Sequence, residues 1–165
     1  MTVPNVLPGL AIVWHSRTGA SEAMARAAVE GAGTIGRLYS AESVESHDLL
    51  AAGAYLFVCP ENLGGLSGMM KEMFDRLYYP LLGKIEGRVY ATAIAAGSAG
   101  QGAEAQIDRI ATGWRLRRVA APLIINTNAQ TPEEILARKE LAEGTLAKCR
   151  ELGAALAEGL RLGIY

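Results

Sequence analysis

The chain contains the stretch Leu10-Ala11-Ile12-Val13-Trp14-His15-Ser16-Arg17-Thr18-Gly19-Ala20-Ser21, in which a short apolar run gives way to a turn rich in hydroxyl groups. Residues 10–14 predict a buried strand, and residues 21–31 predict a helix with an apolar face of small residues. A turn between such a strand and helix brings hydroxyl groups and the free N–H groups of a helix N-terminus toward one point. The stretch therefore predicts a phosphate-binding loop.

The residues of this predicted phosphate loop are Ser16, Arg17, Thr18, Gly19, Ala20 and Ser21. The glycine allows the backbone to come close to a bound anion, and the serine and threonine hydroxyls can donate hydrogen bonds to it. The alternative is that Thr18 or Ser21 caps the helix and binds no ligand, because helix N-termini use the same residue types.

Short apolar runs alternate with longer amphipathic segments along the rest of the chain. Strands are expected over residues 10–14, 36–39, 54–59, 89–95 and 122–126, and helices over residues 21–31, 48–50, 67–78, the segment after 97–102, and a C-terminal helix starting at Thr131-Pro132-Glu133-Glu134. Such alternation is typical of βαβ units with a parallel sheet. We predict an α/β fold in which a doubly wound sheet of five parallel strands, in the order 2-1-3-4-5, has helices on both faces. The chain is expected to form a single domain over residues 1–165.

Two further glycine-bearing loops follow the third and fourth predicted strands. The second loop contains Pro60, Glu61, Asn62, Leu63, Gly64 and Gly65, and the third contains Gly97, Ser98, Ala99, Gly100, Gln101 and Gly102. In a sheet of this order, all three loops lie at the edge where ligands bind. Freed backbone groups and the Asn62 amide suit the polar edge of a ring system, and Leu63 or Leu66 could pack on its face. Turn formation alone is the alternative for each loop.

Other phosphate-binding motifs do not fit the chain. No GxxxxGK[ST] sequence is present, which argues against a P-loop NTPase. The sequence Gly100-Gln101-Gly102 follows the fourth predicted strand, not the first, and lacks the third glycine of the dinucleotide fingerprint G-x-G-x-x-G. His15 stands where a phosphoacceptor receiver domain would have acidic residues.

Composition narrows the function classes. The 165 residues carry a formal net charge of −1, which is neither the basic footprint of a nucleic-acid-binding protein nor a strongly acidic surface. No apolar run is long enough for a membrane span and the start lacks a signal-peptide pattern, so we expect a cytoplasmic protein without a membrane partner. Cys59 and Cys149 are expected to be packing residues, and the two histidines give no pattern for a metal site.

Three polar side chains near the predicted loops have simpler interpretations than catalysis. Lys71 and Asp75 are four residues apart on a predicted helix, a spacing that favours a surface ion pair. His15, at the mouth of the predicted site, either donates a hydrogen bond to a ligand or stabilises the end of its strand.

Two motifs resemble those of a known family. Residues 16–21 resemble the flavodoxin phosphate loop, (S/T)-x-T-G-x-(T/S). The more specific motif is PENLGGLSGMMKEMFDR at residues 60–76, which is similar to P-x-(N/Y)-x-G...S-G-x-(M/L)-K-x-F-x-D-R of NAD(P)H-dependent FMN reductases and related quinone reductases. The resemblance covers about residues 10–126 and implies a flavodoxin-like fold. It also implies that the first loop binds the FMN phosphate and the other two hold the isoalloxazine ring. The chain departs from the family by having no aromatic residue in its second loop.

The resemblance implies an oxidoreductase in which FMN accepts electrons from NADH or NADPH and passes them to a quinone, free flavin or similar small acceptor. No catalytic residue is expected, because the flavin carries the redox chemistry. The alternative is a flavodoxin-type electron-transfer protein without small-molecule turnover, which the near-neutral charge disfavours. A flavin-free interaction module on the same scaffold is a third interpretation. Since related reductases associate, a homodimer or homotetramer is expected, with the helix over 70–80 and Tyr78-Tyr79-Pro80 supplying an apolar contact. No nucleic-acid partner is expected.

Overall fold

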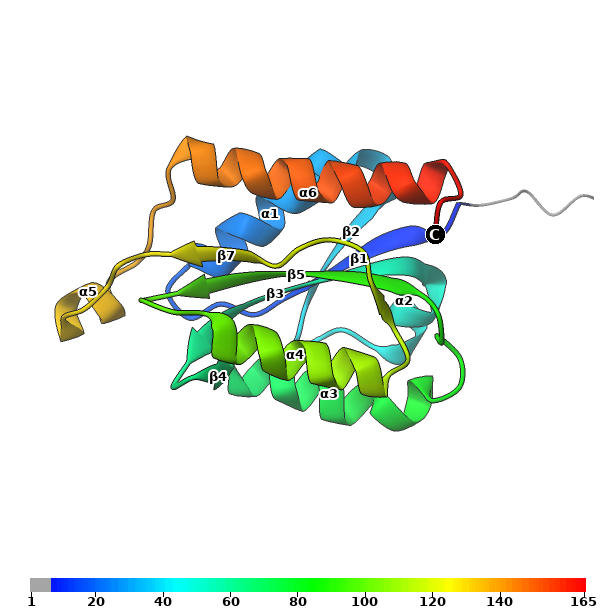
Figure 1. Ribbon diagram of the computed structural model, residues 1–165, viewed down its shortest axis with the longest axis horizontal. Helices are drawn as coiled ribbons and strands as arrows, with labels where there is room; N and C mark the ends of the chain where they lie inside the picture. Colours follow the sequence, from blue (N-terminus) through cyan, green and yellow to red (C-terminus); the bar gives the residue numbers. More distant parts are fainter. Residues whose placement is uncertain (1–6) are drawn as a thin grey trace, which may run out of the picture.

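The computed structural model describes residues 7–165, in which a largely parallel sheet lies between two layers of helices (Figure 1). The strands are β1 (Gly9–Trp14), β2 (Gly36–Ser40), β3 (Ala52–Asn62), β4 (Gly65–Leu66), β5 (Val89–Ala96), β6 (Arg117–Arg118) and β7 (Leu123–Asn126). The parallel strands run in the order β2-β1-β3-β5, and both β6 and β7 pair with β5 at the far edge. The predicted α/β fold and its order 2-1-3-4-5 are confirmed, with β6 and β7 together taking the place of the fifth strand.

Helices cover both faces of the sheet, as predicted. They are α1 (Ala20–Ala32), α2 (Ser46–Ala51), α3 (Gly68–Leu81), α4 (Gln101–Gly113), α5 (Pro132–Leu136) and α6 (Glu143–Arg161), and a 3-10 turn follows α1 at Gly33–Ile35. Helices α1 and α6 lie over one face, and α3 and α4 lie over the other (Figure 1). Within residues 7–165, no helix combines the length and the apolar character that crossing a bilayer requires.

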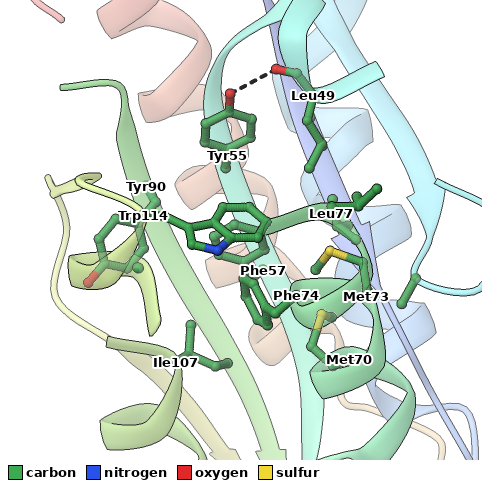
Figure 2. Close-up of a cluster of buried hydrophobic side chains, with 14 of the residues drawn as sticks. Leu49, Tyr55, Phe57, Met70, Met73, Phe74, Leu77, Tyr90, Ile107 and Trp114 are labelled. Atoms are coloured by element: carbon green, nitrogen blue, oxygen red, sulfur yellow. Dashed lines mark hydrogen bonds between the residues drawn. The ribbon is translucent and has the colours of Figure 1, made fainter. Parts of the chain in front are cut away.

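The central strands β3 and β5 are buried because their side chains alternate between two apolar layers. On the α3/α4 side, aromatic rings interlock: the Phe74 ring centroid lies 4.9 Å from that of Phe57 and 5.1 Å from that of Trp114, both edge-on (Figure 2). Such edge contacts stabilise a core beyond the area that they bury. Cys59 belongs to this layer and Cys149 to the other, and burial raises their pKa values to about 12 and about 11. Both cysteines are therefore packing residues, as expected.

The opposite layer depends on small residues that let α1 and α6 approach closely. A Cβ atom at Gly153 would lie 1.9 Å from the carbonyl oxygen of Ala28, and one at Gly31 would lie 2.0 Å from that of Arg150. The two helices therefore meet backbone to backbone along the second half of α1.

Two segments differ from the sequence-based expectation. The helix expected from Thr131 onward is two helices, because α5 ends at Leu136 and residues 137–142 run outside any helix before α6 begins. The second predicted loop is partly strand: β3 continues to Asn62 and turns back into β4 as an antiparallel hairpin. Neither change affects the order of the main strands.

Candidate functional site

The carboxyl ends of β1, β3 and β5 meet at a cleft of about 200 Å³. The first, second and third predicted loops all contribute to it, together with a later segment. Its lining consists of Ser16, Arg17, Thr18, Ala20, Pro60, Glu61, Asn62, Ala95, Ala96, Gly97, Thr127, Ala129, Ile135, Leu136 and Lys139. The cleft is smaller than the roughly 300 Å³ at the lower end of ligand pockets, so a mononucleotide would extend beyond it.

A larger hollow, of about 350 Å³, lies at the other end of the sheet, between the start of β1, β2 and α2. None of the three predicted loops lines it. We place the candidate site in the smaller cleft because open α/β sheets bind ligands at the carboxyl ends of their strands, where the order of strands reverses.

The first loop turns sharply from β1 into α1. The backbone N–H of Gly19 donates to Ser16 Oγ at 3.0 Å, and Gly19 has a φ of +99°, in the left-handed region that favours glycine. The Ser16 hydroxyl accepts this bond and can still donate its own proton to a ligand. Thr18 does not cap α1, since the N-cap residue is Gly19, which has no side chain to bond to the free N–H groups of the first turn.

Ser21 lies in the first turn of α1 and is the one described residue whose buried side-chain oxygen has no hydrogen-bond partner. It is 1% exposed. Most buried hydroxyl groups in proteins are paired, so an unpaired one beside a helix N-terminus is unusual. This position is where the sequence places a phosphate-binding hydroxyl.

The tip of the second loop is a two-residue turn formed by Leu63 and Gly64, with φ values of +51° and +78°. The Leu63 side chain is fully exposed, at 108% of its reference area, beside the cleft residue Asn62. Leu66 is 7% exposed and packs in the α3/α4 core, so it does not offer a face to a bound ring. Gly65 pairs with Asn62 across the hairpin and lies outside the cleft.

Glu61 lines the cleft, but its carboxylate is engaged by the start of α4. Oε1 accepts a hydrogen bond from Gly100 N at 3.0 Å, and Oε2 accepts one from Ala103 N at 3.1 Å. A negative charge at a helix N-terminus satisfies free N–H groups and interacts favourably with the helix dipole. Glu61 therefore joins the second loop to the third.

The glycines of the third loop serve close packing. A Cβ atom at Gly100 would lie 2.5 Å from Ile124 Cγ2, and one at Gly102 would lie 2.0 Å from the Gly64 carbonyl oxygen. Of this predicted loop only Gly97 lines the cleft, whereas Ser98, Ala99, Gly100, Gln101 and Gly102 lie outside its lining. Their contact with a cofactor stays a prediction.

Sequence reasoning missed the segment after β7, which supplies Thr127, Ala129, Ile135, Leu136 and Lys139 to the cleft. Helix α5 starts as predicted, with Thr131 Oγ1 accepting from Glu134 N and the Glu134 carboxylate accepting from Thr131 N. Lys139 N then donates to the carbonyl oxygen of Thr18 at 2.8 Å, which ties the segment to the first loop. No breaker residue between 133 and 142 signals this change of direction, so no local pattern could have found it.

His15 lies outside the lining of the cleft and stabilises the end of its strand. Its Nδ1 lies 2.8 Å from the Oγ of Ser67, the buried residue that precedes α3. Burial lowers the pKa of His15, the charge of Glu42 raises it, and the charge of Arg17 lowers it. The surface ion pair between Lys71 and Asp75 is confirmed, at 2.7 Å. In the part of the chain that the structure describes, no group of His, Cys, Asp and Glu side chains could hold a metal ion.

Comparison with known proteins agrees with this geometry. Residues 42–128 match the family described as NADPH-dependent FMN reductase. A flavodoxin from Aquifex aeolicus (strain VF5) is 32% identical over 97 residues, which are 56% of this chain and 52% of that protein. The chain thus spans about half of this relative.

Solved structures show the same fold at low sequence identity. A flavodoxin from the domain Archaea superposes with a TM-score of 0.74 at 18% identity, over 93% of this chain and 99% of that one. A flavodoxin, WrbA-like protein from Agrobacterium tumefaciens superposes with a TM-score of 0.74 at 20% identity, over 94% of this chain and 98% of that one. The family match includes β3, the hairpin, α3, β5 and α4, and within it the carboxyl ends of β3 and β5 line the cleft. The chain belongs to the NADPH-dependent FMN reductase family.

Proposed function

We propose that this protein binds FMN in the cleft at the carboxyl ends of β1, β3 and β5 and passes electrons from NADPH or NADH through it to a small acceptor such as a quinone or free flavin. The observation that carries the proposal is the convergence of three separate loops, at residues 16–21, 60–65 and 97–102, on one edge of the sheet. Family membership supplies the reaction class.

The first loop fits a phosphate monoester. The unpaired hydroxyl of Ser21 in the first turn of α1 would gain a partner from a phosphate oxygen, and the helix dipole favours an anion there. Ser21 itself is buried and lies outside the lining of the cleft, whereas Ser16 and Thr18 line it and offer donors there. A cofactor fits this loop if it ends in a phosphate that reaches the turn between β1 and α1.

The other walls suit a ring system with one polar edge. Pro60, Ala95 and Ala96 give the cleft an apolar floor, and Asn62 supplies an amide beside it. When bound, FMN supplies the redox chemistry, taking up hydride from the nicotinamide and giving up electrons to the acceptor. The residues of this chain hold and orient the cofactor, so no acid–base pair of side chains is required.

A flavodoxin-type electron carrier is the second candidate, and the identity to the Aquifex flavodoxin favours it. Carriers of this type rely on charge to attract redox partners, whereas this chain has a formal net charge of −1. The near neutrality of the chain favours the reductase.

The deciding experiment is titration of the purified protein with FMN, followed by flavin fluorescence, and then by measurement of NADPH and NADH consumption with and without a quinone. A reductase consumes nicotinamide only with FMN bound and faster with quinone. A protein that binds FMN and is inert to both nicotinamides is a carrier. A protein that FMN does not bind contradicts both functions and leaves the flavin-free interaction module.

Substitution at the first loop tests where the cofactor lies. Thr18→Leu places an apolar side chain in the cleft and is expected to weaken FMN binding, because the hydroxyl is lost and the space is filled. Thr112→Leu, on α4 and away from the cleft, is the matched control. Equal FMN affinity for both variants would show that FMN binds elsewhere.

A further inference from the structure

The segment that follows β7 lies against the first loop. Its contact is made by backbone, through the 2.8 Å hydrogen bond from Lys139 N to Thr18 O, so it does not depend on the rotamer of a long side chain. The preceding residue, Arg138, lies against Gly19: its Cζ and Nη1 atoms are each 3.4 Å from the position that a Cβ atom of Gly19 would take. A guanidinium group is thus placed directly beside the N-cap of α1.

Local polar bonds hold this segment in its position. Lys139 Nζ donates to the carbonyl oxygens of Glu134, Ile135 and Ala137 at 2.7, 3.1 and 2.6 Å, which satisfies the last carbonyls of α5. Ile135 and Leu136 are 52% and 78% exposed, so apolar burial contributes little to the position of α5. Together with the Thr131 capping box, these bonds hold α5 and residues 137–139 in one short folded segment. This segment contacts the first loop through the bond from Lys139 N to Thr18 O.

Two groups beside α1 lack partners among the described residues. Arg138 makes no ion pair and no side-chain hydrogen bond with any of them, and the carboxylate of the nearby Glu134 accepts hydrogen bonds from the backbone of Gln130 and Thr131 instead. The buried hydroxyl of Ser21 is the second group. The guanidinium of Arg138 lies beside Gly19 at the start of α1, where the helix dipole and a cation both favour an anion.

We propose that Arg138 is a phosphate-binding residue, which lies beside the first loop and pairs with the terminal phosphate of the cofactor. The ligand class is a phosphate monoester dianion, because a planar guanidinium can donate two parallel hydrogen bonds to such a group. This inference rests on the proposed FMN site. It adds a residue from the far end of the chain, beyond the region that matches the family.

The test compares FMN with riboflavin, which has the same ring and no phosphate. Arg138→Gln is expected to weaken FMN binding about tenfold, the loss of a charge-assisted hydrogen bond, and to leave riboflavin binding unchanged. Arg138→Lys keeps the charge without the planar fork. Its FMN affinity is therefore expected to lie between that of Arg138→Gln and that of the unmodified protein. Arg109→Gln, an exposed arginine on α4, is the charge-matched control and is expected to bind both ligands as the unmodified protein does. Affinities come from fluorescence titration, and the FMN affinity of Arg138→Gln should depend less steeply on salt.

The outcomes separate this inference from the proposed function. Equal FMN affinity for Arg138→Gln and the unmodified protein overturns the role of Arg138, as does an equal loss for FMN and riboflavin, which would place its effect on the fold or the ring. If the unmodified protein binds no FMN but inorganic phosphate raises its melting temperature, and Arg138→Gln removes that rise, the proposed function fails and the phosphate site stands. If neither FMN nor inorganic phosphate binds, both fail.

Discussion

The carboxylate of Glu61 accepts a hydrogen bond from the backbone N–H of Ala103 at 3.1 Å, so a residue of the second loop completes the N-terminus of α4. Glu61→Gln keeps one acceptor oxygen and loses the negative charge. We expect a loss of about 1 kcal/mol in the free energy of unfolding, the typical value of a cap and its charge at a helix N-terminus. Urea denaturation measures it. Glu86→Gln, an exposed residue, should leave stability unchanged, and an equal effect of both variants would contradict the cap.

Ser21→Ala separates stability from binding. Removing a buried hydroxyl that has no partner should raise the free energy of unfolding of the cofactor-free protein by roughly 1 kcal/mol, because the desolvation cost is removed. The same change should weaken FMN binding. Ser43→Ala, on an exposed turn, is the control for both measurements. A less stable Ser21→Ala protein would mean that this hydroxyl is paired in solution.

Leu63→Asn is expected to stabilise the hairpin between β3 and β4. Leu63 has a φ of +51°, and the left-handed region costs an ordinary residue roughly 1–2 kcal/mol, whereas asparagine tolerates it. Leu63→Ala keeps the backbone cost and removes the same apolar side chain. If Leu63 packs on bound FMN, both variants weaken FMN binding and only Leu63→Asn raises the melting temperature. Unchanged FMN affinity in both would remove Leu63 from the site.

Two glycines of α6 should respond oppositely to alanine. Gly153→Ala brings a Cβ atom to 1.9 Å from Ala28 O, so α1 and α6 must separate and the melting temperature should fall markedly. Gly144→Ala meets no atom within 4 Å and should be neutral or stabilising by up to about 1 kcal/mol. Thermal unfolding of the two variants tests this contrast. A stable Gly153→Ala protein would show that the helices are less closely packed.

His15 gives stability a dependence on pH. Its folded-state pKa lies below the usual 6.5, chiefly through burial, so the unfolded chain binds the proton more tightly. The contribution of neutral His15 to the free energy of unfolding is therefore present above pH 6.5 and is lost as the pH falls below that value. His15→Asn, which keeps a polar group facing Ser67, should show a shallower loss of stability between about pH 7 and pH 5. A His15→Asn protein with the same slope as the unmodified protein would show that His15 does not cause this dependence.

Sequence patterns predicted the sheet order because the central strands β1, β3 and β5 are largely apolar runs and the crossovers between them are long enough for a helix. They also placed the cleft, since residues 16–20 and 60–62 lie where strands end. Hydrogen bonds and packing between distant residues lie outside such reasoning. Nothing local shows that Glu61 bonds to Gly100, or that Gly102 packs on Gly64.

The break between α5 and α6 shows the same limit. Residues 133–142 have good helix-forming composition, and the helix nevertheless ends at Leu136. The bond from Lys139 N to Thr18 O and the three carbonyls held by Lys139 Nζ favour the turned conformation. A tertiary contact overrides intrinsic propensity here, so the fourth wall of the cleft could be found only in the structure.

The contact between Gly102 and Gly64 makes the conformational entropy lost on ligand binding unequal on the two sides of the cleft. Backbone meets backbone at this contact outside the lining of the cleft, so the second and third loops have little freedom left to lose when a ligand arrives. On the other side the segment with Ile135 and Leu136 is exposed and held by polar bonds at its ends. Most of the conformational entropy lost on binding is therefore lost on the α5 side. Substitutions in α5 should change the dissociation rate of a ligand more than they change the shape of the empty site.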